Sequence, residues 1–433
     1  MAQFITVCPY CNSALQVQSE WIGQEVECSI CHNAFVIPPP VQNRITPQTA
    51  ESAILPKYSS KSAPKKKKVI ITLSIIIAVL LGIGITTVTV KHFVEQKRIA
   101  EEKRIAEQKR FAEQKRFAEE LNTAKAQGFQ FGDNDKTLLK CPENVKEVII
   151  PYGINSIGYA AFKDCKNLQS IVIPDSVTSI WDRAFWGCHN LQSVTIPDSV
   201  TYIGEKAFLG CHNLQSVTIG NSVTYIGEEA FYGCENLQSV TIGNSVTYIG
   251  KLAFSGVKSV KVADGNPNFY VDDSGELIDR KNKKLLYCPP SISGNYIIPV
   301  SVTTIGESAF YGCENLQSVT IPDSVTKIGD SAFYGCENLQ SVTIGNSVTT
   351  IGKEAFRWCK NLQSVTIPDS VTTIGEEAFW YCSNLQSVTI GNSVTTIGNS
   401  AFEGCENLQS VTIPRNCEVG NEAFPDECKV IRR

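Results

Sequence analysis

Histidine and methionine are scarce in this sequence of 433 residues, which has four histidines and one methionine. No Ser/His/Asp or Cys/His set, no phosphate-binding glycine loop and no recurrent carboxylate pair stands out, so we expect no enzymatic activity. Charge of either sign is also nearly balanced, because the formal net charge is −4 and the pI is about 5.8. This balance gives no global bias toward nucleic acid, and no nucleic-acid partner is expected.

Hydrophobic residues make up 42% of the chain, and its length allows two or three domains. The seventeen cysteines fall into two groups that need separate explanations. Four lie in the first 40 residues, and the others lie beyond residue 140.

The first group has the spacing of a four-cysteine zinc site. Two CxxC pairs, "CPYC" and "CSIC", are separated by 16 residues. Each tight turn presents two thiolates from one side, and a tetrahedral Zn²⁺ needs two such pairs. Since all four ligands are protein sulfurs, residues 1–40 predict a structural zinc ribbon, whose metal would supply most of its folding energy. The ligands are Cys8, Cys11, Cys28 and Cys31.

Two alternatives accompany this prediction. The four cysteines could be unrelated thiols, and His32, which follows Cys31 directly, is interpreted as a bystander. The segment resembles the small zinc ribbons found at the N-termini of bacterial membrane proteins.

A membrane span is predicted next. Residues 41–68 are polar and rich in Pro, Ser and Lys, which indicates a flexible basic linker. Residues 69–90, "VIITLSIIIAVLLGIGITTVTV", contain no charge and would form about 33 Å of helix, enough to cross a hydrocarbon core of roughly 30 Å. The position is too far from the start for a cleaved signal peptide, and a buried soluble helix is the alternative.

The flanks of this span are nearly equal in basic residues, six in the 15 positions before it and five in the 15 after it. The Lys65–Lys68 cluster directly before the span and the reducing conditions that suit zinc thiolates place the N-terminus in the cytoplasm. The remainder of the chain is then expected outside the cytoplasm.

Residues 91–127 are predicted to form a charged helical stalk. The motif "EQKRIA" repeats every six residues, and pairs such as Lys97–Glu101 and Lys103–Glu107 have the spacing of helical ion pairs. Its larger apolar residues are six apart and spiral around the helix, which argues against a heptad coiled coil. A basic nucleic-acid arm is the rival interpretation, weakened because Glu nearly balances Lys and Arg.

The rest of the chain is repetitive with a period of 23 residues, as in "IPDSVTYIGEKAFLGCHNLQSVT". Such a period predicts a solenoid, mostly β with short helical turns, in which each repeat buries its apolar side against its neighbours. Leu191, Val194 and Ile196 should point inward from one strand, Val200 and Ile203 from a second extended segment, and Ala207 and Phe208 from a short helical turn. Gly204 and Gly210 should let the chain bend tightly.

These residues resemble the leucine-rich repeats of the BspA-like bacterial surface-protein family. Over about residues 141–431 the period, "IPxSVTxIGxxAF" and "CxNL" all agree, and the solenoid is expected to occupy residues 128–433. The resemblance implies a curved solenoid with a sheet on the concave face, and binding or adhesion at a surface. Ser176 and Ser199 stand where the general leucine-rich pattern has Asn or Cys, which puts the usual asparagine ladder in doubt.

One long repeat, at about residues 255–298, interrupts the period. Alternating runs around Asp273–Gly275 and Lys281–Lys284 predict hairpin strands. The stretch is either an embellishment typical of the family or a dedicated binding insertion.

Most of the remaining cysteines occupy one column of the repeat and should stack as a buried ladder, with disulfides between neighbouring turns as the alternative. The column contains Cys165, Cys188, Cys211, Cys234, Cys313, Cys336, Cys359, Cys382 and Cys405.

Candidate binding residues are found where the repeats differ. The strand exteriors repeat Ser and Thr, a lattice that could face a glycan but that strand propensity also explains.

His189 and His212 share a column and should lie side by side, either as an adventitious metal pair or as ordinary surface residues. Directly after the Ala-Phe pair, one column is rich in aromatic residues and forms either an exposed binding ridge or packing between turns. Its members are Trp186, Tyr232, Tyr311, Tyr334 and Trp380.

Together these features predict a single-pass membrane protein that displays a leucine-rich solenoid on a helical stalk for protein or glycan ligands. The alternative is a membrane signalling protein whose cytosolic zinc ribbon contacts an intracellular partner.

Overall fold

The computed structural model describes residues 3–7, 14–18, 25–27, 34–36, 87–132 and 134–433. The chain divides into two units, residues 1–89 and 90–433, and each is described by itself. The described part of the first unit consists of two antiparallel hairpins. One pairs β1 (Gln3–Val7) with β2 (Ala14–Gln18), and the other pairs β3 (Glu25–Glu27) with β4 (Ala34–Val36).

A single long helix, α2 (Thr87–Ala126), covers the segment in which the six-residue repeat predicted a helix. The expected ion pairs involved lysine, but along the described helix arginine makes most of the pairs. Arg98 pairs with Glu95 at 2.6 Å, Arg104 with Glu101 at 2.6 Å and Arg116 with Glu120 at 2.7 Å. The predicted Lys97–Glu101 and Lys103–Glu107 pairs are not formed. Glu101 instead pairs with Arg104, whose fork-shaped guanidinium group matches a carboxylate better than an ammonium group does.

The predicted membrane span lies outside the described residues except for its last four, Thr87–Val90, which begin α2. No helix within the described ranges is long and apolar enough to cross a membrane.

The C-terminal end of α2, within the predicted stalk, packs on the first turn of the solenoid. Leu121 and Ala124 are buried, and the backbone N–H of Tyr152 donates to Glu120 at 3.0 Å. Lys125 and Asp135 form an ion pair at 2.8 Å. This end of the helix therefore covers the apolar end of the repeat stack, as solenoids require.

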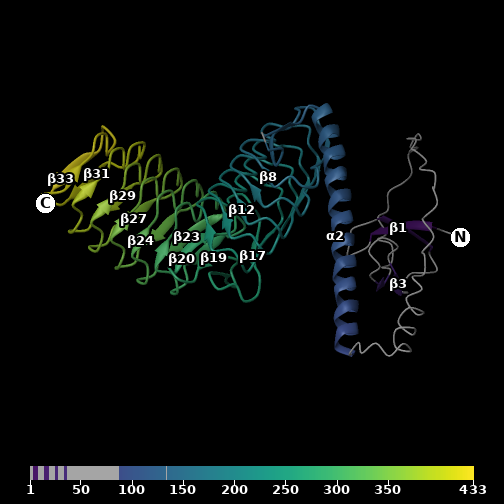
Figure 1. Ribbon diagram of the computed structural model, residues 1–433. Helices are drawn as coiled ribbons and strands as arrows, with labels where there is room; N and C mark the ends of the chain where they lie inside the picture. Colours follow the sequence, from purple (N-terminus) through teal and green to yellow (C-terminus); the bar gives the residue numbers. More distant parts are fainter. Residues whose placement is uncertain (1–2, 8–13, 19–24, 28–33, 37–86, 133) are drawn as a thin grey trace, which may run out of the picture. The chain divides into compact units, whose positions relative to one another are not determined.

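Each repeat contributes two short strands, and equivalent strands of successive repeats pair in parallel to form two series of sheets (Figure 1). One series is formed by the strand that contains the Ser-Val-Thr motif in most repeats, together with the equivalent strands of the other repeats. All of these are here called SVT strands. The SVT strands are β7 (Glu147–Ile149), β9 (Ser170–Val172), β11 (Ser193–Ile196), β13 (Ser216–Ile219), β15 (Val240–Ile242), β17 (Val260–Val262), β21 (Gly294–Ile297), β23 (Leu316–Thr320), β25 (Ser341–Thr343), β27 (Ser364–Thr366), β29 (Ser387–Thr389), β31 (Ser410–Ile413) and β33 (Lys429–Arg432).

The second series is built from shorter strands, here called TI strands, which mostly have two residues. In the first block they are β6 (Thr137–Lys140), β8 (Ser156–Ile157), β10 (Ser179–Ile180), β12 (Tyr202–Ile203), β14 (Tyr225–Ile226) and β16 (Tyr248–Ile249), with β5 (Gln130–Phe131) antiparallel at the edge. In the second block they are β22 (Thr304–Ile305), β24 (Lys327–Ile328), β26 (Thr350–Ile351), β28 (Thr373–Ile374), β30 (Thr396–Ile397) and β32 (Glu418–Val419).

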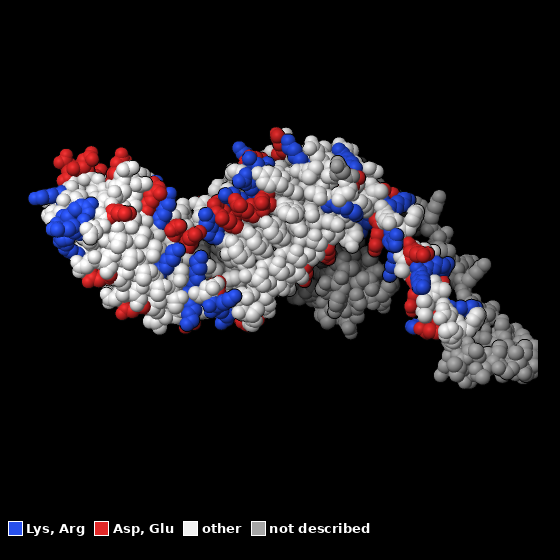
Figure 2. Space-filling model, turned by 60° about the vertical axis from the view of Figure 1, so that its left-hand side comes forward, with Lys and Arg blue, Asp and Glu red and all other residues white. Residues whose placement is uncertain are grey.

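The pairing register keeps identical residues above one another. Between β11 and β13, Ser193 lies beside Ser216 and Thr195 beside Thr218, with both rows exposed. On the face shown in Figure 2, charged side chains gather in clusters and most of the repeat surface is uncharged. The Ser/Thr lattice expected from the sequence is therefore present on the SVT strands.

The buried core confirms the inward and outward assignment of the repeat. Leu191, Val200, Ile203, Ala207 and Phe208 are all 0% exposed, and Val194 and Ile196 are at most 3% exposed. The phenylalanine rings stack nearly parallel along the solenoid, with centroids 4.9 Å apart for Phe185 and Phe208.

The turn that carries the Ala-Phe pair is not helical, so the prediction of short helical turns was wrong. The residue before each Ala has a left-handed backbone, with φ of 56° at Lys206 and 53° at Glu229. A right-handed helix cannot continue through that conformation. The backbone instead bonds to the next turn of the solenoid, as where Phe185 N–H donates to Ala207 O at 2.7 Å.

Two glycines of the repeat have different roles. Gly210 has a φ of 71°, which confirms its predicted place in a tight bend. Gly204 does not bend the chain in this way. A Cβ atom there would lie 2.4 Å from the backbone nitrogen of Asp182, so Gly204 is needed because two successive turns approach each other closely.

Polar side chains link successive turns in regular ladders. Serines stand where the general leucine-rich pattern has Asn or Cys, and they make such bonds themselves. Ser199 Oγ, for example, donates to Val177 O at 2.6 Å. An asparagine ladder exists elsewhere, at the Asn of the "NLQ" motif, where Asn236 Nδ2 donates to His212 O at 2.8 Å.

The cysteine column is buried as predicted, and its nine members are at most 2% exposed. Each thiol can donate to a carbonyl oxygen of the preceding turn, as Cys188 Sγ does to Phe162 O at 3.0 Å. Burial also raises the pKa of the Cys359 thiol, which keeps it protonated. All thirteen cysteines of the described repeat region are free, so hydrogen bonds and packing, rather than disulfides, account for the column.

The long repeat divides the solenoid into two hydrophobic cores. It forms the expected hairpin strands, with β18 (Phe269–Val271), β19 (Leu277–Asp279) and β20 (Lys284–Tyr287) paired antiparallel and β20 then parallel to β22. On β19, Leu277 packs into the first core and Ile278 into the second.

The alternation of buried and exposed residues in β15 and in the segment directly before it predicts unequal effects of two substitutions. Leu237 is 0% exposed, so Leu237→Ala should lower the free energy of unfolding by roughly 2–5 kcal/mol through a cavity. Exposed Thr241→Ala should lower it by less than about 1 kcal/mol.

Denaturant melts of residues 90–433, which form one compact unit, would measure both values. The first transition should be compared, because a solenoid need not unfold in a single step. Equal losses at the two positions would contradict the assignment.

Candidate binding edge

The residues after each Ala-Phe pair form the turn edge, the part of the solenoid where the repeats differ most. The five aromatic residues of this column are half-buried, not fully exposed. Tyr311 and Tyr334 stack at 5.2 Å, and Tyr232 reaches Tyr311 with a hydroxyl hydrogen bond of 2.8 Å. Packing between turns therefore accounts for these three tyrosines, and a binding role for the column stays a prediction.

The two tryptophans of the column contact cationic side chains. Lys163 Nζ lies 4.5 Å and the Arg183 guanidinium 5.4 Å from the ring centroid of Trp186. The Arg357 guanidinium lies 4.0 Å from the ring of Trp380, close enough for a cation–π contact. Trp186 is thereby held in place by one side chain of the preceding turn and one of its own turn, and Trp380 by a side chain of the preceding turn.

Two aromatic residues that the sequence analysis did not single out lie beside this column. Trp358 and Tyr381 are 36% and 44% exposed. They occupy the position of Gly210 in the repeat and keep its left-handed backbone, with φ of 64° and 56°. That conformation costs a residue with a side chain about 1–2 kcal/mol. The signal in the sequence was "AFRWC" and "AFWYC" where other repeats have "AFLGC" or "AFYGC".

The rings of Trp358, Trp380 and Tyr381 form one group, here called the edge cluster. Their centroids are 4.2 Å apart for Trp380–Tyr381, 6.2 Å for Trp358–Tyr381 and 6.3 Å for Trp358–Trp380. The ring of Tyr381 leans over Gly404 of the next turn, where a Cβ atom would lie 2.9 Å from it.

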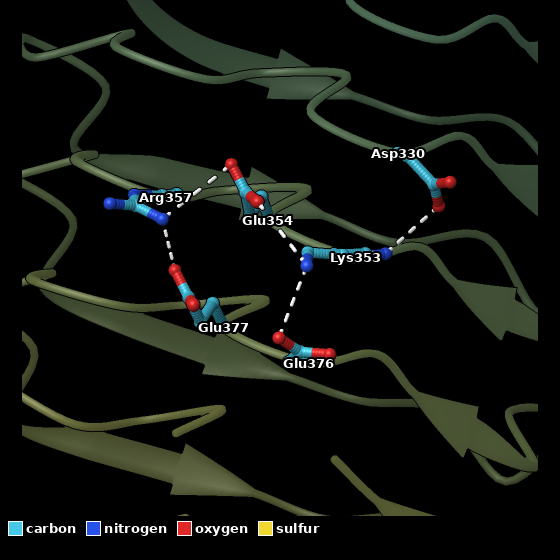
Figure 3. Close-up of polar contacts among 6 residues, drawn as sticks. All are labelled: Asp330, Lys353, Glu354, Arg357, Glu376 and Glu377. Atoms are coloured by element: carbon cyan, nitrogen blue, oxygen red, sulfur yellow. Dashed lines mark hydrogen bonds and ion pairs between the residues drawn. The ribbon is translucent and has the colours of Figure 1, made fainter. Parts of the chain in front are cut away.

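A network of charged residues borders the edge cluster through Arg357, which contacts Trp380. Figure 3 shows the residues of this network. Arg357 bonds to Glu377 and lies 3.6 Å from Glu354, so its orientation under Trp380 is fixed from two sides. Lys353 pairs with Glu376 at 3.1 Å and with Glu354 at 3.8 Å. The backbone N–H of Lys353 donates to Asp330 at 2.9 Å. The network thus connects three consecutive turns.

The histidine pair is side by side as predicted, with ring centroids 5.1 Å apart. Nδ1 of His189 lies 2.9 Å from Gly210 O, and Nδ1 of His212 lies 3.0 Å from Gly233 O. Within the described ranges no group of three or more His, Cys, Asp or Glu residues could hold a metal ion. The pair is accounted for by stacking and backbone hydrogen bonds.

The four predicted zinc ligands lie outside the described residues. Their place in the chain can still be compared with the strands around them. Cys8 and Cys11 fall between the paired strands β1 and β2, and Cys28 and Cys31 fall between β3 and β4. Each CxxC pair therefore falls, in the sequence, between two strands that pair with each other.

One buried carboxyl group lies in the long repeat. Glu276 is 0% exposed, accepts a hydrogen bond from the Tyr296 hydroxyl, and has Cys288 Sγ 3.8 Å from the same oxygen. Its other oxygen has no hydrogen-bond partner among the described residues. Burial raises the pKa of Glu276 to about 8, so the group is largely protonated at neutral pH.

These observations define the class of protein. Two series of parallel sheets, a stacked Leu/Val/Ile/Phe core and a 23-residue period make the second unit a leucine-rich-repeat solenoid. The sequence matches the family described as BspA type leucine rich repeat region, in six copies, over residues 134–261 and 295–431. The chain belongs to this family.

Solved bacterial structures are similar to this chain. The pneumococcal vaccine antigen PcpA is similar with a TM-score of 0.57 and 21% identity, covering 69% of this chain and 92% of that chain. A leucine-rich repeat protein from Eubacterium ventriosum has a TM-score of 0.50 and 24% identity, covering 65% and 88%. A leucine rich cell surface protein from Faecalibacterium prausnitzii has a TM-score of 0.48 and 28% identity, covering 66% and 92%. No curated protein matches the sequence.

The buried carboxyl group predicts how stability depends on pH. The folded pKa of Glu276 exceeds its ordinary value of 4.5, so the native state holds the proton more tightly than the unfolded chain does. Stability should therefore fall as the pH rises from 4.5 toward about 8.

Glu276→Gln should remove that fall, because the amide stays neutral throughout. Urea melts of residues 90–433 between these pH values would measure the effect. Asp273→Asn, a change of an exposed carboxyl group in the same hairpin, serves as the control and should keep the wild-type dependence. A wild-type slope retained by Glu276→Gln would contradict the assignment.

Proposed function

We propose that this protein is a membrane-anchored leucine-rich-repeat protein that displays its solenoid outside the cytoplasm to bind protein or glycan ligands. Its repeat unit belongs to the BspA type family. In this proposal the role of the solenoid is binding, not catalysis. The anchor is the apolar segment 69–90, and α2 separates the repeats from it.

One observation carries the binding proposal. The core and sheet positions of the repeats are nearly identical, and large variable side chains gather on the turn edge. There the column of Trp186, Tyr232, Tyr311, Tyr334 and Trp380 continues into the exposed rings of Trp358 and Tyr381. Since tryptophan, tyrosine and arginine supply most strong contacts in binding surfaces, the turn edge is the proposed ligand-facing surface.

The N-terminal part is proposed to be a cytoplasmic zinc ribbon. Cys8, Cys11, Cys28 and Cys31 would hold one Zn²⁺, which supplies a structural cross-link between the two hairpins. The support for this proposal is the position of each CxxC pair between two paired strands. All four ligands are thiolates, so the ion would have no free position for a substrate.

The zinc proposal predicts that Cys8→Ser and Cys28→Ser each remove the metal and most of the β structure from the fragment 1–40, since metal binding supplies the folding energy. Zinc content and circular dichroism would measure both effects. His32→Ala is the matched control and should keep one zinc ion. Full resistance of the wild-type fragment to a strong chelator would show that the fold does not need metal.

The display proposal predicts the result of trypsin treatment of intact spheroplasts. Lysine and arginine side chains of α2 are exposed, so trypsin should cut there and release the repeat unit. An epitope placed before Lys65 should survive until the membrane is permeabilised. Loss of the epitope together with an intact repeat unit would reverse the orientation.

A further inference from the structure

The edge cluster is placed where the fold alone favours glycine. Seven turns have glycine at this position, with φ between 70° and 91°. They are Gly187, Gly210, Gly233, Gly256, Gly312, Gly335 and Gly404. Asp164 has the same position in an early turn with φ of 58°, a conformation that aspartate adopts more readily than an aromatic residue does. Trp358 and Tyr381 take the same left-handed backbone on two consecutive turns, although a side chain there is strained. Stability therefore does not account for these two aromatic residues, which indicates that they serve a ligand.

The cluster is small and isolated on its surface. Between residues 301 and 428, Trp358 and Tyr381 are the only large hydrophobic side chains that are exposed. A stable protein interface buries about 800 Å² on each partner around a continuous apolar centre. Two rings in a charged surrounding do not supply such a centre. They match the size of one or two sugar rings, whose C–H faces pack on aromatic rings while their hydroxyl groups bond to polar neighbours.

The charges around the cluster limit the kind of sugar. Arg357 is already paired with Glu354 and Glu377, and Lys360 Nζ lies 2.8 Å from Glu337 and 4.9 Å from the Trp358 ring. Trp380 Nε1 donates to Glu403 at 3.3 Å. With Lys353, which pairs with Glu354 and Glu376, three cationic groups thus face five carboxylates, and each of these cations already has an acidic partner. The carboxylates can instead accept hydrogen bonds from hydroxyl groups.

We propose that the edge cluster, Trp358, Trp380 and Tyr381, is a binding site for a neutral saccharide. This inference rests on the proposed function and names the ligand class for one part of the turn edge. Trp358 and Tyr381 provide the exposed ring surface, Trp380 supports them from below, and Arg357 fixes Trp380 through its own ion pairs.

The repeats themselves supply the test variant. In Trp358→Gly/Tyr381→Gly each strained position receives the residue that seven other turns have. The double variant should fold normally, with an unfolding midpoint that is unchanged or raised. Trp181→Gly is the matched control, because Trp181 is 46% exposed and stands in the Gly204 column, away from the cluster.

The purified full chain in detergent would be applied to arrays of neutral, sialylated and sulfated oligosaccharides and of purified surface proteins. Affinities for the best neutral oligosaccharide would follow by calorimetry. We expect wild type and Trp181→Gly to bind equally and the double variant to bind about tenfold or more weakly.

Equal saccharide binding by the double variant would overturn the site, and preference for sialylated or sulfated sugars would overturn the ligand class. Binding of a protein without any saccharide would also overturn the ligand class, but would leave the proposed function standing. Failure to bind anything on either array would overturn both.

Discussion

Every turn of the solenoid depends on the in-register stacking of its neighbours. A phenylalanine ring such as Phe208 has a parallel ring about 5 Å away on each side, and its turn bonds through the backbone to the turns before and after it. Such stacking works only when the residue above and the residue below have the same size and the same φ and ψ. This constraint explains why nearly the same 23 residues recur along the chain, because the side chains and backbone of each turn must match those of the next.

The same constraint decides where function can reside. A substitution in the core column alters the packing of two neighbouring turns. A substitution on the turn edge instead alters a side chain that already points away from the stack. The edge cluster shows how far this freedom extends, because the backbone at Trp358 and Tyr381 retains the conformation set by the glycines of other turns. The ladder holds the strained conformation in place, so the side chain can be chosen for its surface.

The repeat core could be predicted from the sequence because burial is periodic. Leu237, Phe208 and the cysteine column lie where their spacing placed them. Features that depend on the distance between two turns could not be predicted in this way. The need for Gly204 comes from a contact with Asp182 of the preceding turn, and the absence of a helix at Ala207–Phe208 comes from the left-handed residue before it. The ion pairs that arginine makes along α2 depend on the shape of the guanidinium group. The positions of charged residues in the sequence do not show which cation a carboxylate will choose. In the sequence, Trp358 and Tyr381 stand out because they replace glycine in their column. Only the structure shows that their side chains are exposed.

The division of the core at the long repeat has a mechanical consequence. Residues of the first core pack with α2, and the edge cluster lies on turns whose buried residues form the second core. Strand β19 contributes one side chain to each core. A pulling force between a bound ligand and the N-terminal side of the chain must pass through this junction, where neither series of sheets is continuous. The junction at β19 is therefore expected to open first under load, while both cores and the edge cluster stay folded. Opening and closing of this junction would let the protein absorb tension without losing its ligand.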